Sequence, residues 1–203
     1  MRRREFLSGL PLALTACGLA ERPYAEQRQW PMLIRRPVVL RARANGLVLE
    51  VRGLRAGPGL ESRGLQTLQA DGSMRTEFYE QWAVPPAQAV EDALRIWLGQ
   101  SGHFSAVVSP GSRLTADISL EGELTALWAN TVTGTARAAI AVIALDVRTP
   151  ARRILLTRTM DGNAVLADRK PAAAVQAQLT ALAETFAQIE AALIPMTRTT
   201  TRL

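Results

Sequence analysis

The sequence contains very little of the chemistry that most catalytic and metal sites use. Its 203 residues include one cysteine, one histidine and one lysine, and only 5% of the residues are aromatic. A single cysteine excludes an intramolecular disulfide, and structural zinc sites need several cysteines and histidines. No glycine motif of the phosphate-binding or dinucleotide-binding type opens a helix. The sequence therefore predicts no catalytic residue, no metal site and no cofactor.

The charge is basic, and it comes almost entirely from arginine. The net charge is +6, and it falls to +4 in residues 17–203, because three arginines and one glutamate lie in residues 1–16. The length suits one domain with a core large enough to fold without disulfides. An excess of this size is weak support for nucleic acid, and we predict no such partner. An anionic membrane surface is a better counterpart, and an arginine-rich composition without a specific partner is the simpler interpretation.

The first 16 residues have the order of features of a signal peptide. A positively charged start is followed by an apolar run over residues 6–14 and by small residues. The run is far shorter than the roughly 20 residues that span a bilayer as a helix. Arg3 and Arg4, followed by Phe6 and Leu7, resemble the twin-arginine export motif, which a receptor reads as an address. A general secretory signal with a long basic start is the alternative.

Cys17 ends this segment in the sequence Leu14-Thr15-Ala16-Cys17, which resembles the lipobox of bacterial lipoproteins. There the cysteine thiolate, a strong nucleophile, is lipidated and becomes the new N-terminus. The resemblance implies acyl chains such as palmitate on Cys17, and Gly18 in place of an aspartate favours the outer membrane. Residues 17–37 contain three prolines and no periodic pattern, as expected of a tether. A buried cysteine in an ordinary signal peptide is the alternative.

The following chain alternates short strand patterns with turn residues. Asn45-Gly46 predicts a hairpin between Val38–Leu40 and Leu47–Val51, and Asp71-Gly72 predicts a second between Leu65–Leu68 and Met74–Phe78. Further strands are expected at residues 104–108, 114–128, 136–147 and 153–160, with a hairpin over 146–160. In the longest, Ile118, Leu120, Leu124 and Trp128 are expected to share the buried face.

Two segments have the periodicity of amphipathic helices. Pro85 and Pro86 are placed to open the first, which is expected to end near Gly99. The second has apolar residues spaced four and three apart from Val175 to Leu193, and Pro195 is expected to end it. Residues 196–203 are predicted to be a disordered tail. Together the elements predict an α+β domain over residues 38–195, with a mainly antiparallel sheet and two helices packed on one face.

The remaining polar residues give weak signals for a site. His103 lies at a turn, where we expect it to face solvent without a carboxylate neighbour. Asp117, Glu121 and Glu123 share one face of the 114–128 strand, opposite its apolar residues. This alternation is typical of any half-buried antiparallel strand, and no second acidic cluster completes a calcium or acid–base site. The three carboxylates are therefore interpreted as structural.

One stretch resembles a known family. Tyr79, Gln81, Trp82-Ala83 and Pro85 occupy the positions of a Tyr, an Arg or Gln, a Trp-Ala pair and a Pro that precede a helix in the ABC-type transport auxiliary lipoproteins. That family includes the C-type lipoproteins of paraquat-inducible operons. The order of elements over residues 38–194 is also similar, whereas the Tyr-x-Leu run that the family has after the cysteine is absent. Trp30-Pro31-Met32-Leu33 is the closest counterpart to that run.

The resemblance implies a non-catalytic, lipid-anchored periplasmic component of a mammalian-cell-entry (MCE) type ABC transport system. Its implied partners are an MCE-domain protein, a permease and an ATPase, which move phospholipid or another hydrophobic molecule between the inner and outer membranes. Tyr79 and Trp82 are candidates for the partner interface, because aromatic residues are enriched at binding hot spots. For Trp82 a place in the core is an equal alternative. A homo-oligomer is compatible with this role.

Two other functions remain open at this point. One is an accessory lipoprotein for outer-membrane assembly or lipopolysaccharide insertion, which would share the anchor and the small fold. The other is an exported hydrolase that uses carboxylates such as Asp117, Glu121 and Glu123.

Overall fold

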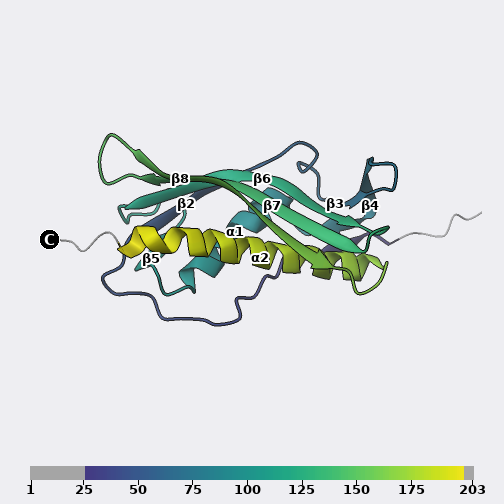
Figure 1. Ribbon diagram of the computed structural model, residues 1–203, viewed down its shortest axis with the longest axis horizontal. Helices are drawn as coiled ribbons and strands as arrows, with labels where there is room; N and C mark the ends of the chain where they lie inside the picture. Colours follow the sequence, from purple (N-terminus) through teal and green to yellow (C-terminus); the bar gives the residue numbers. More distant parts are fainter. Residues whose placement is uncertain (1–25, 199–203) are drawn as a thin grey trace, which may run out of the picture.

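The computed structural model describes residues 26–198, in which eight strands and two helices form two layers (Figure 1). The predictions for Arg3, Arg4, Phe6, Leu7 and Cys17 lie outside these residues. The elements, in chain order, are β1 (Arg28–Trp30), β2 (Val48–Ala56), β3 (Gly64–Leu68), β4 (Met74–Trp82), α1 (Pro86–Gly99), β5 (Ala106–Val108), β6 (Ile118–Asn130), β7 (Thr135–Asp146), β8 (Arg153–Val165) and α2 (Pro171–Arg198).

The sheet is mixed, and the prediction of a mainly antiparallel sheet is wrong. Within residues 26–198, four of the seven strand pairings are parallel, namely β1·β4, β2·β5, β2·β6 and β3·β6. The antiparallel pairings are β3·β4, β6·β7 and β7·β8. Hairpin turns indicate only antiparallel neighbours, whereas a parallel pair needs a long crossover whose return point is not marked in the sequence. The strand β6 is the centre of the sheet, because it pairs with β2 and β3 along one edge and with β7 along the other.

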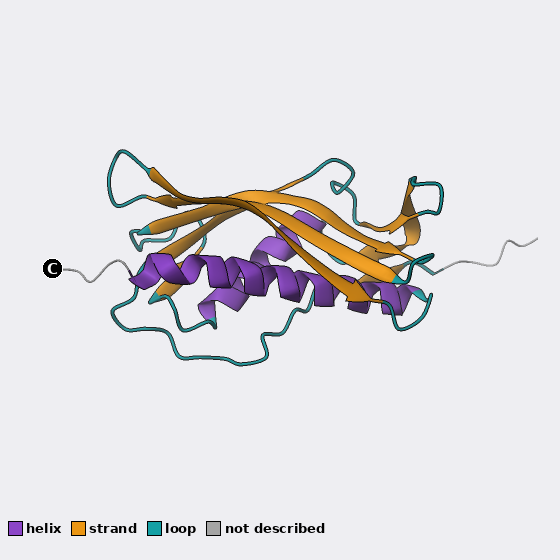
Figure 2. Cartoon of the chain, viewed as in Figure 1, coloured by secondary structure: helices purple, strands orange, loops and turns teal. Residues whose placement is uncertain are grey.

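Both helices cover the same face of the sheet (Figure 2). Helix α1 follows Pro85 at its N-cap and has Pro86 in its first turn, where the missing N–H costs least. It buries Val90, Leu94 and Leu98 against β2, and α2 packs across β7 and β8. Neither helix among residues 26–198 is long and apolar enough to cross a membrane. The two helices on one face agree with the prediction.

A large hydrophobic core lies between the sheet and the helices, and a second, smaller cluster lies where the end of β6 and the start of β7 meet the start of α2. The largest fully buried side chains of the large core include Trp82 at the end of β4, Leu120 of β6, Ile140 of β7 and Phe186 of α2. The ring of Phe186 meets that of Trp97 edge to face, with 5.8 Å between centroids. Aromatic contacts of this geometry are favourable beyond the area that they bury. The core therefore joins all the long elements of the described chain.

Three local predictions were wrong. Residues 38–40 form no strand, because the N–H of Leu40 donates to Gln100 O at 2.9 Å and the segment follows the loop after α1 instead of β2. A β-bulge at Thr125 reverses the alternation of β6, so that Leu127 is buried at 1% exposure and Trp128 lies on the other face. Finally, α2 continues through Pro195 to Arg198 and does not end before it.

An ion pair fixes the end of β7. Asp146 accepts hydrogen bonds from Arg148 at 2.9 Å (Nε to Oδ1) and 2.6 Å (Nη2 to Oδ2). These bonds are the main reason that the pKa of Asp146 is lowered to about 2, and they raise the pKa of Arg148. The charged form of this carboxyl is therefore favoured by the folded state.

Acid is expected to remove this contribution. The pKa of Asp146 is about 2 in the folded chain, against an ordinary value of 3.8 in the unfolded chain, so its stabilisation is complete above about pH 4 and lost as the pH falls toward 2. We expect Asp146→Asn to lower the free energy of unfolding by about 1 kcal/mol at neutral pH, because the pair is partly screened by solvent. Urea unfolding of both proteins between pH 2 and 7 measures this loss. A difference in the free energy of unfolding between Asp146→Asn and the wild type that stays constant down to pH 2 would contradict the prediction.

Candidate functional site

The predicted interface residues of β4 lie in opposite environments. Tyr79 is 50% exposed and Phe78 beside it 69% exposed, and their rings meet edge to face with 5.1 Å between centroids. Met74, at the start of the same strand, is 48% exposed. We call Met74, Phe78 and Tyr79 the β4 apolar surface. Trp82 is only 1% exposed, so it lies in the core and not at an interface.

The strand β1 reinforces β4 next to this surface. It pairs with β4 in parallel register, with Trp30 opposite Trp82. The Trp30 indole donates to Glu80 Oε2 at 2.6 Å, and the side chain of Gln27 donates to the carbonyl of Phe78 at 3.0 Å. The exposed apolar side chains are therefore held on a paired strand and not on a loop.

The three carboxylates of the hydrolase alternative are spread along the sheet. Asp117 is 9% exposed and accepts a hydrogen bond from Val48 N at 2.9 Å, which fixes the start of β2 against β6. Glu123 forms an ion pair with Arg55 of β2, with 3.5 Å between Glu123 Oε2 and Arg55 Nη2. Among residues 26–198 no group of three or more histidine, cysteine or acidic side chains could hold a metal ion. Asp117 and Glu123 thus have structural partners within the sheet.

The carboxylate of Glu190 on α2 is contacted by nitrogen donors from three separate segments of the chain. Its side chain is 11% exposed and that of Arg36 12% exposed, and Arg36 Nη2 lies 2.7 Å from Glu190 Oε1. The Trp97 indole donates to Glu190 Oε2 at 2.8 Å, and His103 Nε2 lies 3.3 Å from Oε1. The prediction that His103 has no carboxylate neighbour was wrong, because its partner is distant in sequence.

These contacts attach the segment between β1 and β2 to the helical layer. The segment runs along the side of the helices that faces away from the sheet (Figure 1). The guanidinium of Arg36 lies over the Trp97 ring, 5.9 Å from its centroid. A groove of about 520 Å³ opens here, with Val38 on one side and Ala187 and Ile194 of α2 on the other. Sequence reasoning missed this cluster, although Glu190 borders the apolar stripe of α2 directly after the buried Ile189.

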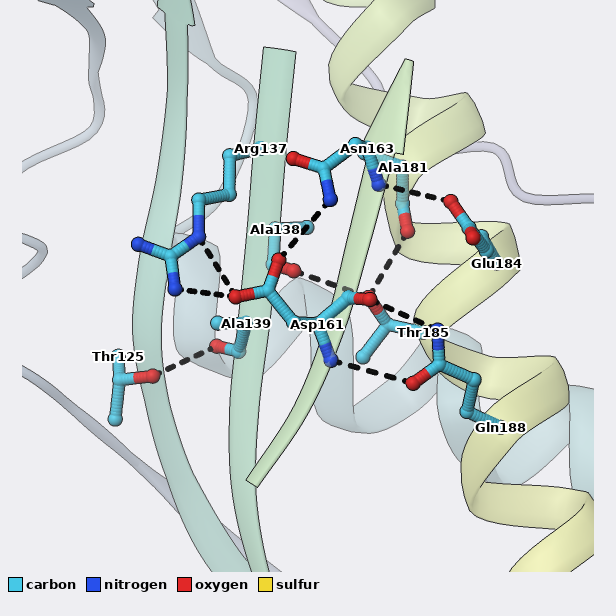
Figure 3. Close-up of polar contacts among 10 residues, drawn as sticks. All are labelled: Thr125, Arg137, Ala138, Ala139, Asp161, Asn163, Ala181, Glu184, Thr185 and Gln188. Carbon is cyan, nitrogen blue, oxygen red and sulfur yellow. Dashed lines mark hydrogen bonds and ion pairs between the residues drawn. The ribbon is translucent and has the colours of Figure 1, made fainter.

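A second polar network joins α2 to the edge strand β8 (Figure 3). The carboxylate of Asp161 accepts hydrogen bonds from Arg137 on β7, and this contact raises the pKa of Arg137. The Gln188 amide accepts from the N–H of Asp161 at 3.4 Å and donates to its carbonyl at 2.8 Å. Glu184 accepts from the N–H of Asn163 at 2.8 Å. Side chains of α2 therefore occupy edge groups of β8 that would otherwise pair with another strand.

The comparison with protein families decides the identity of this domain. The family model for the ABC-type transport auxiliary lipoprotein component matches residues 34–190. The chain belongs to this family. The match includes the residues that suggested the resemblance and both helices, apart from the last turns of α2.

Solved structures show the same fold. Protein XCC0632 from Xanthomonas campestris, of the DUF330 family, is 18% identical, with a TM-score of 0.62 over 76% of this chain and 87% of that one. The crystal structure of an uncharacterized protein is 15% identical, with a TM-score of 0.60 over 75% of this chain and 94% of that one. No curated protein is detectably similar in sequence. Membership of the auxiliary lipoprotein family supports an accessory role in ABC-type transport and an association with the cell envelope.

Proposed function

We propose that this auxiliary lipoprotein is a non-catalytic, lipid-anchored component of an MCE-type ABC transport system. In this role it faces the periplasm, is held at the outer membrane by acyl chains on Cys17, and contacts an MCE-domain protein that works with a permease and an ATPase. The system moves phospholipid or another hydrophobic molecule between the two membranes. The observation that carries the proposal is the family match over residues 34–190.

The β4 apolar surface is the proposed contact with the partner. Exposed aromatic side chains that are already fixed in place lose little conformational entropy on binding and are common at hot spots. Phe78 and Tyr79 meet this description, because they pack against each other on a strand that β1 supports. Trp82 contributes indirectly, since it anchors the end of β4 in the core.

The partner is tested by purifying the chain from detergent-solubilised envelopes after mild crosslinking in cells, followed by mass spectrometry. Recovery of an MCE-domain protein with a permease and an ATPase is the expected result. Recovery of a β-barrel protein alone would favour the outer-membrane assembly role instead. If no partner is recovered, the transport proposal fails, and loss of an activity in a variant with amides at Asp117, Glu121 and Glu123 would then identify a hydrolase.

Changing the β4 apolar surface is expected to reduce partner recovery selectively. In the double variant Phe78→Ser/Tyr79→Ser we expect recovery of the MCE-domain protein to fall about tenfold, because two central aromatic contacts are lost. The matched control is Ile154→Ser/Val165→Ser on β8, whose side chains are 64% and 81% exposed. Equal losses in both double variants would show that the β4 apolar surface is not the contact.

Location and assembly are tested separately. Fractionation of membranes should place the wild type in the outer membrane and Cys17→Ala in the soluble periplasmic fraction. Light scattering of the purified chain measures whether the proposed homo-oligomer forms without partners.

A further inference from the structure

A cavity of about 200 Å³ lies where the β3–β4 hairpin meets the start of α2. Its wall includes Arg75 and Glu77 of β4, Arg169 and Lys170 just before α2, and Gln178 two turns into that helix. A single water needs only about 10–15 Å³ of such volume, so the cavity has room for a group of several atoms. None of these residues takes part in the β4 apolar surface.

Gln178 is the unusual member of this wall. It is fully buried, and neither its amide nitrogen nor its amide oxygen has a hydrogen-bond partner among residues 26–198. Buried amides in native proteins are nearly always paired, because an unpaired one loses its water without compensation. An amide that lines a cavity and keeps both a donor and an acceptor unpaired indicates a ligand that can accept and donate there.

The charge around the cavity favours an anion. Glu77 is paired with Arg75 at 3.2 Å between Oε2 and Nη2, and Glu80 is paired with Arg28 at 3.6 Å between Oε1 and Nη1. Arg169 has no ion-pair partner within the described part of the chain. The first turn of α2 has no acidic residue, and the N–H groups at a helix start attract negative charge. Lys170 is paired with Asp168, with 3.9 Å between Nζ and Oδ2. The acidic side chains are thus neutralised, and the positive charge of Arg169 is left over at the start of α2.

We propose that this cavity binds a phosphate group that carries a hydroxyl, as in hydrogen phosphate or a phosphoglycerol. The phosphate oxygens accept hydrogen bonds from the Gln178 amide nitrogen and from Arg169. The hydroxyl donates to the Gln178 amide oxygen, which gives both unpaired atoms a partner. Arginine suits this task, because its planar donor fork matches phosphate oxygens.

The position of the lipobox cysteine suggests where such a phosphate comes from. Eight residues lie between Cys17 and Glu26, and an extended chain of nine residue steps spans at most about 30 Å. The strand β1 follows at once and pairs with β4, whose Glu77 and Glu80 line the cavity. With lipid on Cys17, lipid headgroups lie within reach of the site. This step rests on the proposed anchor, whereas the phosphate site itself does not.

The test uses the Cys17→Ala variant of the full chain, which keeps every described residue and removes only the proposed site of lipidation. Calorimetry with inorganic phosphate and glycerol phosphate measures the free-phosphate source. Sedimentation with phosphatidylglycerol vesicles, in a phosphatidylcholine background, measures the lipid source. Binding to either class of probe supports the site, and the tighter of the two identifies the source.

Two variants separate the site from general electrostatic attraction. Gln178→Leu should weaken binding about tenfold and raise the melting temperature, because the leucine removes an unpaired buried amide. Arg169→Ala/Lys170→Ala changes exposed residues and should weaken binding at least as much. Arg113→Ala/Arg158→Ala removes the same amount of positive charge away from the cavity, and this variant should retain most of the binding. No binding to either probe, an equal loss in both double variants, or full binding by Gln178→Leu would overturn the proposal, and the cavity would then hold water only.

Discussion

Gly162→Ala is expected to lower the free energy of unfolding by about 3 kcal/mol or more. A Cβ at Gly162 would lie 2.0 Å from the carbonyl oxygen of Ala181 and 2.7 Å from Thr185 Oγ1, so helix α2 would have to move away from the sheet. Backbone atoms of a 28-residue helix cannot yield as a flexible side chain does. Chemical denaturation of the purified variant measures the effect.

Gly53→Ala is the matched control, because Gly53 is also a strand glycine, but a Cβ there would have its nearest neighbour, Glu91 Oε2, at 3.8 Å. The control is expected to stay within about 0.5 kcal/mol of the wild type. If Gly162→Ala were equally mild, α2 would not pack on β8 as closely as these distances indicate. If Gly162→Ala does push α2 away from β8, the hydrogen bonds that Gln188 and Glu184 make to β8 would also be lost, and the edge of that strand would be exposed (Figure 3).

The helices were predictable because their signals are local. Pro85 and Pro86 mark the start of α1, and the four-and-three spacing from Val175 to Leu193 gives the buried face of α2. The second hairpin, with its Asp71-Gly72 turn, was also predicted, and Gly72 has the positive φ of 82° that such a turn uses. These features depend on residues close together in the sequence.

The order of the strands was not predictable in this way. The pairings of β2 with β6 and of β3 with β6 bring together segments that are separated in the chain by a helix and other strands. The sequence of neither segment indicates which strand it pairs with. The bulge at Thr125 is likewise a property of the β6–β7 pair, and it reversed the expected facing of Trp128. Gly162 lies beyond the predicted strand 153–160, and its lack of a side chain is what allows α2 to pack closely on β8.

The candidate sites also differ in whether their signal is local in the sequence. Tyr79 was predicted as an interface residue from a short contiguous pattern, and the structure shows that it is exposed on β4. Gln178 and Glu190 have no such pattern, since each is defined by residues that the fold brings from elsewhere. An amphipathic helix with a glutamine or a glutamate at the border of its apolar face is common, and only burial distinguishes these two.

Glu190→Leu is expected to have the second large effect, lowering the free energy of unfolding by about 3 kcal/mol. The substitution leaves the nearly buried Arg36 without its carboxylate and the Trp97 indole without its acceptor. Removing one member of a buried pair costs more than the pair contributes, because the other charge stays desolvated. The double variant Glu190→Leu/Arg36→Met should therefore recover much of the loss. Urea unfolding of the two single variants and the double variant measures the coupling.

Glu184→Gln is the control on the same helix, because Glu184 is exposed and a glutamine can still accept the hydrogen bond from Asn163. It should change the free energy of unfolding by less than about 0.5 kcal/mol. Additive losses in the Glu190 and Arg36 variants would mean that the two side chains do not depend on each other. With strong coupling, the segment between β1 and β2 is fixed to the helical layer through Glu190.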